Sequence, residues 1–204
     1  MVHAPGLKKF DVRRGRRLAG GFLLVFWLLL AGACDAAGTD WLVPVPYRTR
    51  QVVILVIDGP RRSETWDDPS RANIPGLAAL AGKGVLMAGF RNNGYTYTNS
   101  GHAAITTGVY EPIDNNGLQL PGKSSIFQHY LRAAVLPATG AWVITSKDKL
   151  AVLGNTAQAA WKGVNQPALY CGKGGGGLAS GYGEDADTMA MAKEMLAKWH
   201  PGLF

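Results

Sequence analysis

Residues 52–59 read VVILVIDG, and this stretch decides the fold class. A run of β-branched and aliphatic residues without polar alternation predicts a strand buried on both faces, as in a parallel sheet. Asp58 and Gly59 then end the strand abruptly. Because ligands of open parallel sheets gather at the carboxyl ends of the strands, Asp58 stands where a metal-binding carboxylate would be placed. An Asp-Gly pair after a strand is also an ordinary turn, so position alone does not establish that role.

Apolar segments at strand and helix spacing continue along the chain. The patterns predict helices over residues 74–82, 124–135 and 185–199, and strands over residues 85–90 and 141–145. Ser124 is the expected capping residue of the second helix. Strand, helix, strand, helix, strand is typical of a doubly wound α/β fold, in which helices flank a mostly parallel sheet.

The excess of positive charge lies in the first 33 residues. The chain carries a formal charge of +7, and residues 1–33 hold six Lys or Arg against the single Asp11, which leaves +2 for the rest. A body this close to neutral lacks the basic stripe that binds a phosphate backbone. Nucleic acid is therefore not expected as a partner.

An uncharged, mostly apolar run over residues 18–33 follows the basic residues. This run is short for a membrane span, and Ala31 and Ala33 supply the small residues of a cleavage site. Residues 1–33 are therefore predicted to be a secretory signal peptide, and the body to be exported to the periplasm or outside the cell. The alternative, an uncleaved anchor, would also place the body outside the cytoplasm.

Cys34 allows a second interpretation of the leader. Residues 30–34 read LAGAC and resemble a bacterial lipoprotein box, in which the Cys is lipidated after cleavage. The match is imperfect, because Ala31 occupies a position where such boxes usually have Leu. Membrane contact is expected only through this signal or lipid anchor. Cys171 then has no partner within the chain, and no disulfide is predicted.

A polar tether and a folded body follow the leader. Residues 34–51 contain Pro44 and Pro46, which predicts a linker, and residues 52–204 are long enough for one packed domain. Four consecutive glycines at 174–177 follow no predicted strand and precede no Lys-Ser/Thr pair. They therefore indicate a surface loop rather than a phosphate cradle.

The stretch most indicative of chemistry is NNGYTYTNSGHAAITTGVY, residues 92–110. An extended segment leads into a helix of small residues, and Thr98 is expected at the N-terminus of that helix. Unpaired N–H groups and the positive end of the helix dipole favour an alkoxide on Thr98 and a bound phosphoryl oxygen. A hydroxyl is a weak nucleophile unless a metal or a base activates it. A plain capping Thr is the alternative explanation.

Three motifs occur in the order found in one enzyme superfamily. VVILVIDG, NNGYTYTNSGHAAITTG and TSKDKLAVLG resemble the phosphatase and phosphodiesterase branches of the alkaline phosphatase superfamily. The pattern T-x-x-x-H-x-x-x-x-T-G, from Thr98 to Gly108, is the most specific part. The resemblance covers residues 52–204 and only the N-terminal half of the family's domain.

The resemblance implies a metal-dependent hydrolase of phosphate mono- or diesters. Asp58 would bind one metal of a two-metal site, usually zinc. Thr98 would be both a metal ligand and the nucleophile that is transiently phosphorylated, with the two metals clamping the attacking and leaving oxygens. His102 would support the nucleophile turn rather than bind metal.

The same resemblance implies that Asn99, Asn115 or Asn116, Lys147 and Lys149 bind a small phosphate ester. The spacing leaves the choice between Asn115 and Asn116 open. Lys149 stands where some members have Arg, and a Lys supplies a point charge in place of a bidentate fork. Selectivity for monoesters over diesters is therefore undecided. A solvated turn is the alternative explanation for both lysines.

Two departures from the family pattern bear on activity. The chain contains no Cys/Ser-x-Pro-x-Arg sequence, so sulfate-ester hydrolysis through a formylglycine is not expected. The family's other metal ligands belong to the second half of the domain, beyond Phe204. One carboxylate and one hydroxyl do not hold zinc tightly, because stable sites need three or four protein ligands. The chain alone is therefore expected to be inactive, as a fragment, a truncated product or one half of a domain.

Two other functions stay open. One is an exported or membrane-anchored binding module that keeps the fold without catalysis. The other is a relative of the cofactor-independent phosphomutases, which use a Ser nucleophile and for which Ser100 is the candidate. The export signal and Thr98 weigh against this second alternative. Substrate identity and oligomeric state are not determined by the sequence.

Overall fold

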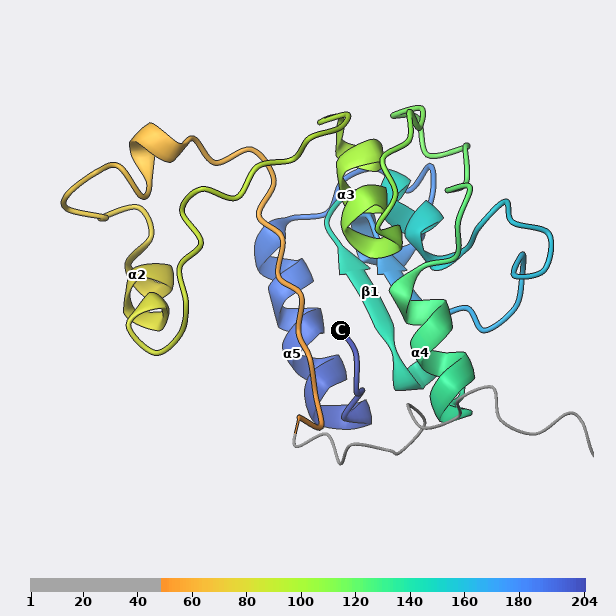
Figure 1. Ribbon diagram of the computed structural model, residues 1–204. Coiled ribbons are helices and arrows are strands. Elements are labelled where there is room, and N and C mark those ends of the chain that lie inside the picture. The colour runs from red at the N-terminus through yellow and green to blue at the C-terminus, as the bar shows by residue number, and fades with distance from the viewer. Residues whose placement is uncertain (1–48) are drawn as a thin grey trace, which may run out of the picture. The chain divides into compact units, whose positions relative to one another are not determined.

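The computed structural model describes residues 49–204, whose course is drawn in Figure 1. The predicted signal peptide, Cys34 and nearly all of the 34–51 linker lie outside the described residues. The α-helices are α2 (Pro75–Ala81), α3 (Thr98–Thr107), α4 (Ile126–Ala134) and α5 (Asp185–Trp199), and the strands are β1 (Trp142–Thr145) and β2 (Ala168–Cys171). The short 3-10 helices are η1 (Arg62–Glu64), η2 (Ala138–Gly140), η3 (Asp148–Gly154) and η4 (Lys173–Gly175). Over residues 49–204, no helix has the length and apolarity to cross a membrane.

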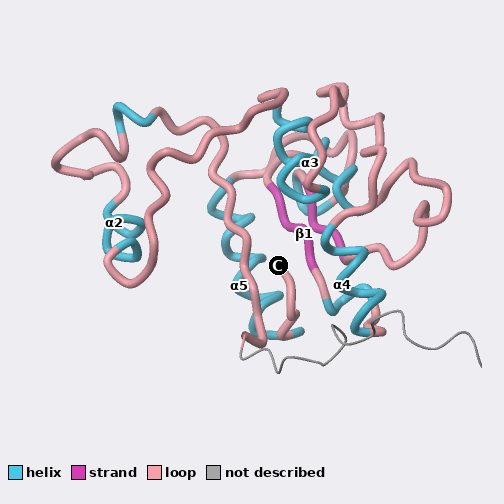
Figure 2. Tube along the Cα trace, in the orientation of Figure 1, coloured by secondary structure: helices cyan, strands magenta, loops and turns pink. Residues whose placement is uncertain are grey.

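The two strands pair in parallel, with Trp142 opposite Ala168 and Thr145 opposite Cys171. Their carboxyl ends therefore lie at the same edge, where η3 follows β1 and η4 follows β2. Figure 2 shows these strands among helices and long loops. The expectation of an α/β fold is confirmed at the level of class: the described residues form a mixed α/β fold with a small parallel sheet.

The end of the described chain lies between β1 and the segment that begins at Val52. Leu203 forms parallel bridges with both Ala141 and Val52. The Phe204 N–H donates to the Val52 carbonyl oxygen at 2.9 Å, and the Ile54 N–H donates to the Phe204 carbonyl oxygen at 2.7 Å. Hydrogen bonding of the parallel type therefore continues past β1 on the side away from β2.

The prediction of a strand buried on both faces over residues 52–57 is wrong. Only Val52 takes part in a bridge, and Val53, Leu55 and Ile57 are 54, 63 and 54% exposed. The segment is hydrogen-bonded along one edge, and within residues 49–204 no strand pairs with its other edge. An apolar run becomes a buried strand only when neighbours cover both edges and both faces, and the sequence pattern does not specify those neighbours.

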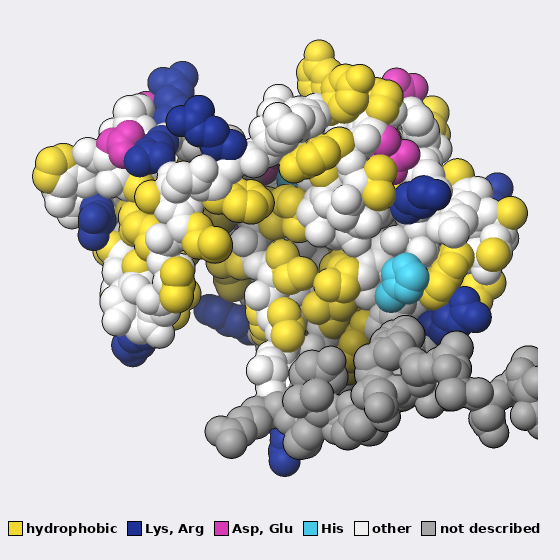
Figure 3. Space-filling model, viewed as in Figure 1, with side chains coloured by type: hydrophobic (Ala, Val, Ile, Leu, Met, Phe, Trp, Pro, Cys, Tyr) yellow, Lys and Arg dark blue, Asp and Glu magenta, His cyan; other side chains and the backbone are white. Residues whose placement is uncertain are grey.

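The predicted strand over residues 85–90 is also wrong. Val85, Met87 and Phe90 are 89, 73 and 81% exposed, and the segment forms turns. Its backbone is held by the Arg62 guanidinium, whose Nη1 donates to the Ala88 carbonyl oxygen at 2.8 Å. No described strand lies beside it to pair with. Hydrophobic side chains are consequently abundant on the face drawn in Figure 3.

The helix predictions are confirmed, with one correction at the cap of α4. Ser125, not Ser124, is the capping residue: its side chain accepts from the Gln128 N–H, and the Gln128 side chain accepts from the Ser125 N–H. This reciprocal pair is a capping box, which requires a Gln or Glu three residues after the Ser. Ser124 instead pairs through its hydroxyl with Nε2 of His129 at 2.8 Å.

Strand β2 is absent from the sequence prediction, although the predicted strand over 141–145 is confirmed as β1. The four residues of β2 read ALYC and follow Pro167 directly. A segment this short has no measurable period of its own. It becomes a strand because β1 offers it a parallel partner.

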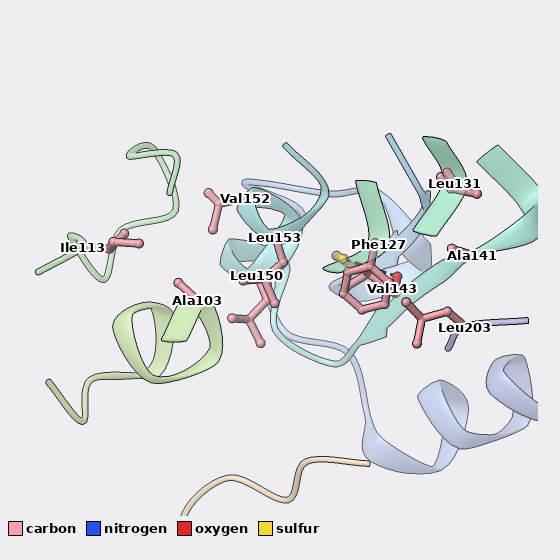
Figure 4. Close-up of a cluster of buried hydrophobic side chains, with 11 residues drawn as sticks. Ala103, Ile113, Phe127, Leu131, Ala141, Val143, Leu150, Val152, Leu153 and Leu203 are labelled. Atoms are coloured by element: carbon pink, nitrogen blue, oxygen red, sulfur yellow. Dashed lines mark hydrogen bonds between the residues drawn. The ribbon is translucent and has the colours of Figure 1, made fainter. Parts of the chain in front are cut away.

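The core lies where β1, η3, α3 and α4 meet, as Figure 4 shows. Its buried members are the side chains of Ala103, Ile113, Phe127, Leu131, Ala141, Val143, Leu150, Val152, Leu153, Cys171 and Leu203. Cys171 is a free thiol, and burial raises the pKa of that thiol. The core thus joins the helix that begins at Thr98 to the strand that leads to Lys147.

Leu203→Ala is expected to destabilise the fold by about 2–5 kcal/mol, because it leaves a cavity between β1 and the segment at Val52. Leu203 is 4% exposed, whereas Leu118, the matched control, is 73% exposed. Urea denaturation followed by circular dichroism measures both variants. Equal losses for Leu203→Ala and Leu118→Ala would contradict the position assigned to Leu203 in the sheet.

Candidate functional site

Three of the predicted site residues converge at one carboxylate. Thr98 Oγ1 donates to Asp58 Oδ2 at 3.4 Å, and Lys147 Nζ donates to the same oxygen. Thr98 and Lys147 are 40 and 89 residues from Asp58 in the sequence, so tertiary structure assembles the cluster. The Asp58 side chain is 38% exposed, which leaves the cluster open to a ligand from solution.

Thr98 is the first residue of α3, as predicted. Tyr97 caps the helix in an extended conformation, and the Gly101 N–H donates to the Tyr97 carbonyl oxygen at 2.8 Å. His102 Nδ1 lies 2.7 Å from the Thr98 carbonyl oxygen, and because a carbonyl can only accept, Nδ1 carries the hydrogen. His102 therefore supports the backbone at the first turn of α3.

The electrostatics of Asp58 are set mainly by Lys147. The hydrogen bond from the Lys147 ammonium holds the pKa of the Asp58 carboxyl below its ordinary value, although partial burial opposes this effect. The positive charge of Lys147, the nearby His102 ring and the Thr98 hydroxyl act in the same direction as the hydrogen bond. Asp58 is therefore an ionised acceptor at neutral pH and a weak base.

Lys147 lies where β1 ends. The Thr145 hydroxyl donates to the Lys147 carbonyl oxygen at 2.8 Å and fixes the backbone at this turn. Lys147 then immediately precedes η3. This is the carboxyl end of a parallel strand, the edge at which α/β proteins bind ligands.

Asn99 and Asn115 hold the first turn of α3 in place. Asn99 is fully buried, and its N–H donates to Oδ1 of Asn115 at 3.1 Å. Its Nδ2 donates to the carbonyl oxygens of Asp114 and Lys149 at 3.2 and 3.4 Å. The pair therefore links α3 to the loop that follows Ile113 and to η3. Of the two candidate residues, it is Asn115 and not Asn116 that contacts the start of α3.

Two predicted residues do not join the cluster. Asn116 uses Oδ1 to accept from the Leu118 N–H at 2.8 Å, which is a local turn contact. The Lys149 ammonium lies 5.9 Å from the centroid of the Tyr182 ring, and Lys149 meets the cluster only through its carbonyl oxygen on Asn99. Lys149 is the second residue of the 3-10 helix η3, in which the chain turns by about a third of a circle per residue, so Lys147 and Lys149 do not share one target.

The residues at this cluster do not make a complete zinc site. Asp58 and Thr98 supply one carboxylate and one hydroxyl, and within residues 49–204 no group of three or more His, Cys, Asp or Glu is arranged to hold a metal. Stable zinc sites need three or four protein ligands. The Lys147 ammonium is the cation that contacts Asp58.

Asp148 is a structurally important residue that the sequence did not single out. Its carboxylate is buried and accepts from the N–H groups of Lys149, Ala179 and Gly181 at 2.7, 3.0 and 3.1 Å. Between two lysines, an Asp is typical of a solvated turn. The available signal was its place three residues after the predicted strand, because an acidic residue is favoured in the first turn of a helix that begins there.

Comparison of the chain with protein-family models, with curated proteins and with solved structures finds no match in any of the three.

Lys147→Met is expected to raise the pKa of Asp58 toward its ordinary value, because the largest influence that lowers it is removed. The lowered pKa stabilises the fold above the ordinary pKa of the carboxyl, and this contribution is lost as pH falls through the lowered value. Titration by carboxyl ¹³C NMR measures the change. Lys162→Met is the control, and an unchanged Asp58 pKa in Lys147→Met would contradict the ion pair.

Proposed function

We propose that the chain is the nucleophile-bearing part of a metal-dependent phosphate-ester hydrolase with the doubly wound fold of the alkaline phosphatase superfamily. Thr98 is the nucleophile, and Asp58 is one metal ligand. What supports the proposal is the meeting of Thr98, Asp58 and Lys147 at the carboxyl end of β1. The order of the three sequence motifs supports it independently.

A phosphoryl group at this cluster would meet two kinds of positive potential. Thr98 is the first residue of α3, at the positive end of the helix dipole, and the Lys147 ammonium contacts the same Asp58 oxygen as the Thr98 hydroxyl. Thr98 Oγ1 is already hydrogen-bonded to Asp58, which orients the hydroxyl. Thr98 Oγ1 would form a bond to phosphorus as the bond from phosphorus to the leaving alcohol oxygen breaks, and the hydroxyl proton would pass to Asp58 Oδ2 while the leaving oxygen takes a proton from water. Lys147 would bind a phosphoryl oxygen as a point charge.

Zinc does not fit the described residues as a complete site, because one carboxylate and one hydroxyl are too few ligands. Asp58, with its lowered pKa, is a weak general base, which leaves the Thr98 hydroxyl without strong activation. The described residues therefore account for binding and orientation better than for turnover. Hydrolysis of mono- or diesters belongs to this domain only together with further metal ligands.

A second candidate function is a binding module derived from the same fold. The ion pair between Lys147 and Asp58 favours it, because a carboxylate neutralised by a lysine needs no metal. The ligand would still be a small phosphate ester. In both proposals a signal peptide exports the chain to the periplasm or outside the cell, and Cys34 would carry a lipid anchor only if the leader is of the lipoprotein type.

Inorganic phosphate is expected to bind the chain at a single site that Lys147→Met weakens by about tenfold, since one charge-assisted hydrogen bond is lost. ³¹P NMR titration measures the affinity. Lys83→Met, which removes an exposed lysine after α2, is the matched control. Equal affinities in wild type and Lys147→Met would argue against phosphate at this cluster.

Zinc binding tests whether the described residues form a metal site by themselves. The chain alone is expected to bind zinc weakly and to hydrolyse neither p-nitrophenyl phosphate nor bis-p-nitrophenyl phosphate, because two donors are too few. Equilibrium dialysis and release of p-nitrophenol measure the two properties. Tight stoichiometric zinc binding or turnover by the chain alone would contradict the incomplete site. In a complete domain that supplies the further metal ligands, turnover that survives Thr98→Ala would contradict the assignment of Thr98 as nucleophile.

A further inference from the structure

We propose that Asp148 is a positioning residue that directs Lys147 toward Asp58 by holding two loops together at the carboxyl edge of the sheet. The assignment of a phosphate to Lys147 rests on the proposed function. The hydrogen-bonded link that Asp148 forms between the two loops, called the clamp below, does not. It rests on hydrogen bonds made by a buried carboxylate that the proposed chemistry does not otherwise use.

The Asp148 carboxylate bridges two segments that are far apart in the sequence. Oδ1 accepts from the Lys149 N–H at 2.7 Å and so holds the start of η3. Oδ2 accepts from the N–H groups of Ala179 and Gly181 at 3.0 and 3.1 Å, which belong to the loop after β2. A carboxylate with both oxygens engaged in this way gives stronger hydrogen bonds than a neutral acceptor does.

The loop that Asp148 holds is seated against the residues on either side of Lys147. The Gly183 N–H donates to the Ser146 carbonyl oxygen at 2.8 Å, immediately before Lys147. Tyr182, between the two attachment points, carries the ring over which Lys149 Nζ lies. Asp148 therefore fixes the backbone positions of Lys147 and Lys149. With its backbone held in this way, the Lys147 side chain extends toward Asp58.

The close approach of the two loops depends on a glycine. Gly172 has φ +74°, and a Cβ at this position would lie 2.5 Å from Asp148 Cβ and 2.4 Å from Ser180 Oγ. Only a residue without a side chain permits that contact. The absence of a side chain at Gly172, directly after β2, therefore gives Asp148 the room to reach the loop after β2.

The position of Lys147 can be followed by competitive acetylation of the full chain without phosphate, with Lys83 as the internal reference. Asp148→Asn replaces one carboxylate oxygen by an NH₂ group, so that a donor competes with the N–H groups of the loop. Lys147 is expected to react about two- to fivefold faster, the factor for loss of one partly exposed ion pair. Asp148→Glu, which keeps the carboxylate, should restore part of the protection.

Asp68→Asn is the matched control, because Asp68 also accepts from a backbone N–H, that of Ser70 at 2.9 Å, but at an exposed turn. It should leave Lys147 unchanged. A purely structural role of Asp148 would raise the reactivity of Lys193 and Lys198 together with Lys147, whereas the clamp predicts a change confined to Lys147 and Lys149. Unchanged Lys147 reactivity in folded Asp148→Asn would overturn the proposal.

If Asp148→Asn does not fold, Gly172→Ala tests the clamp from the other side, since its Cβ pushes against Asp148. The same selective gain at Lys147 is expected, and equal reactivity to wild type would reject the clamp. Adding inorganic phosphate to the wild-type chain then tests the proposed function separately. Protection of Lys147 supports phosphate binding, and no protection rejects that function while the phosphate-free rates still decide the role of Asp148.

Discussion

The hydrogen-bonded edge of β1 is the constraint on which the rest of the structure depends. β1 pairs with β2 on one side and with the segment at Leu203 on the other. This pairing aligns the carboxyl ends of the strands, so that the turn at Lys147 and the loop after Cys171 emerge together. Packing of η3 against α3 then brings Thr98 to the same edge. The site is therefore a consequence of strand pairing and not of local sequence.

At that edge the chemistry is governed by one carboxylate and the cation that neutralises it. Asp58 is partly exposed and ionised, and Lys147 supplies its counter-charge. In a metal-dependent hydrolase the same carboxylate would belong to a divalent ion. Either a lysine or a metal ion can neutralise the Asp58 carboxylate. Which of the two cations does so distinguishes the proposed hydrolase from the proposed binding module.

Buried polar groups hold the segments of the site together alongside the apolar core. Asn99 ties α3 to Asn115 and to η3, and Asp148 ties η3 to the loop after β2. These side chains satisfy backbone groups that no strand or helix would otherwise pair. Such contacts fix directions as well as distances, which is what a site for an oriented phosphate requires.

The sequence by itself determined the helices, the strand at β1 and the position of Thr98 at a helix N-terminus, because period and capping are local properties. It also marked Asp58 and Lys147 as residues at segment ends. Only the tertiary structure decided that residues 52–57 stay exposed, that ALYC pairs as β2, and that Lys147 and Lys149 point to different partners. Those outcomes depend on which segments lie alongside each other, and a strand's neighbours are not encoded in its own residues.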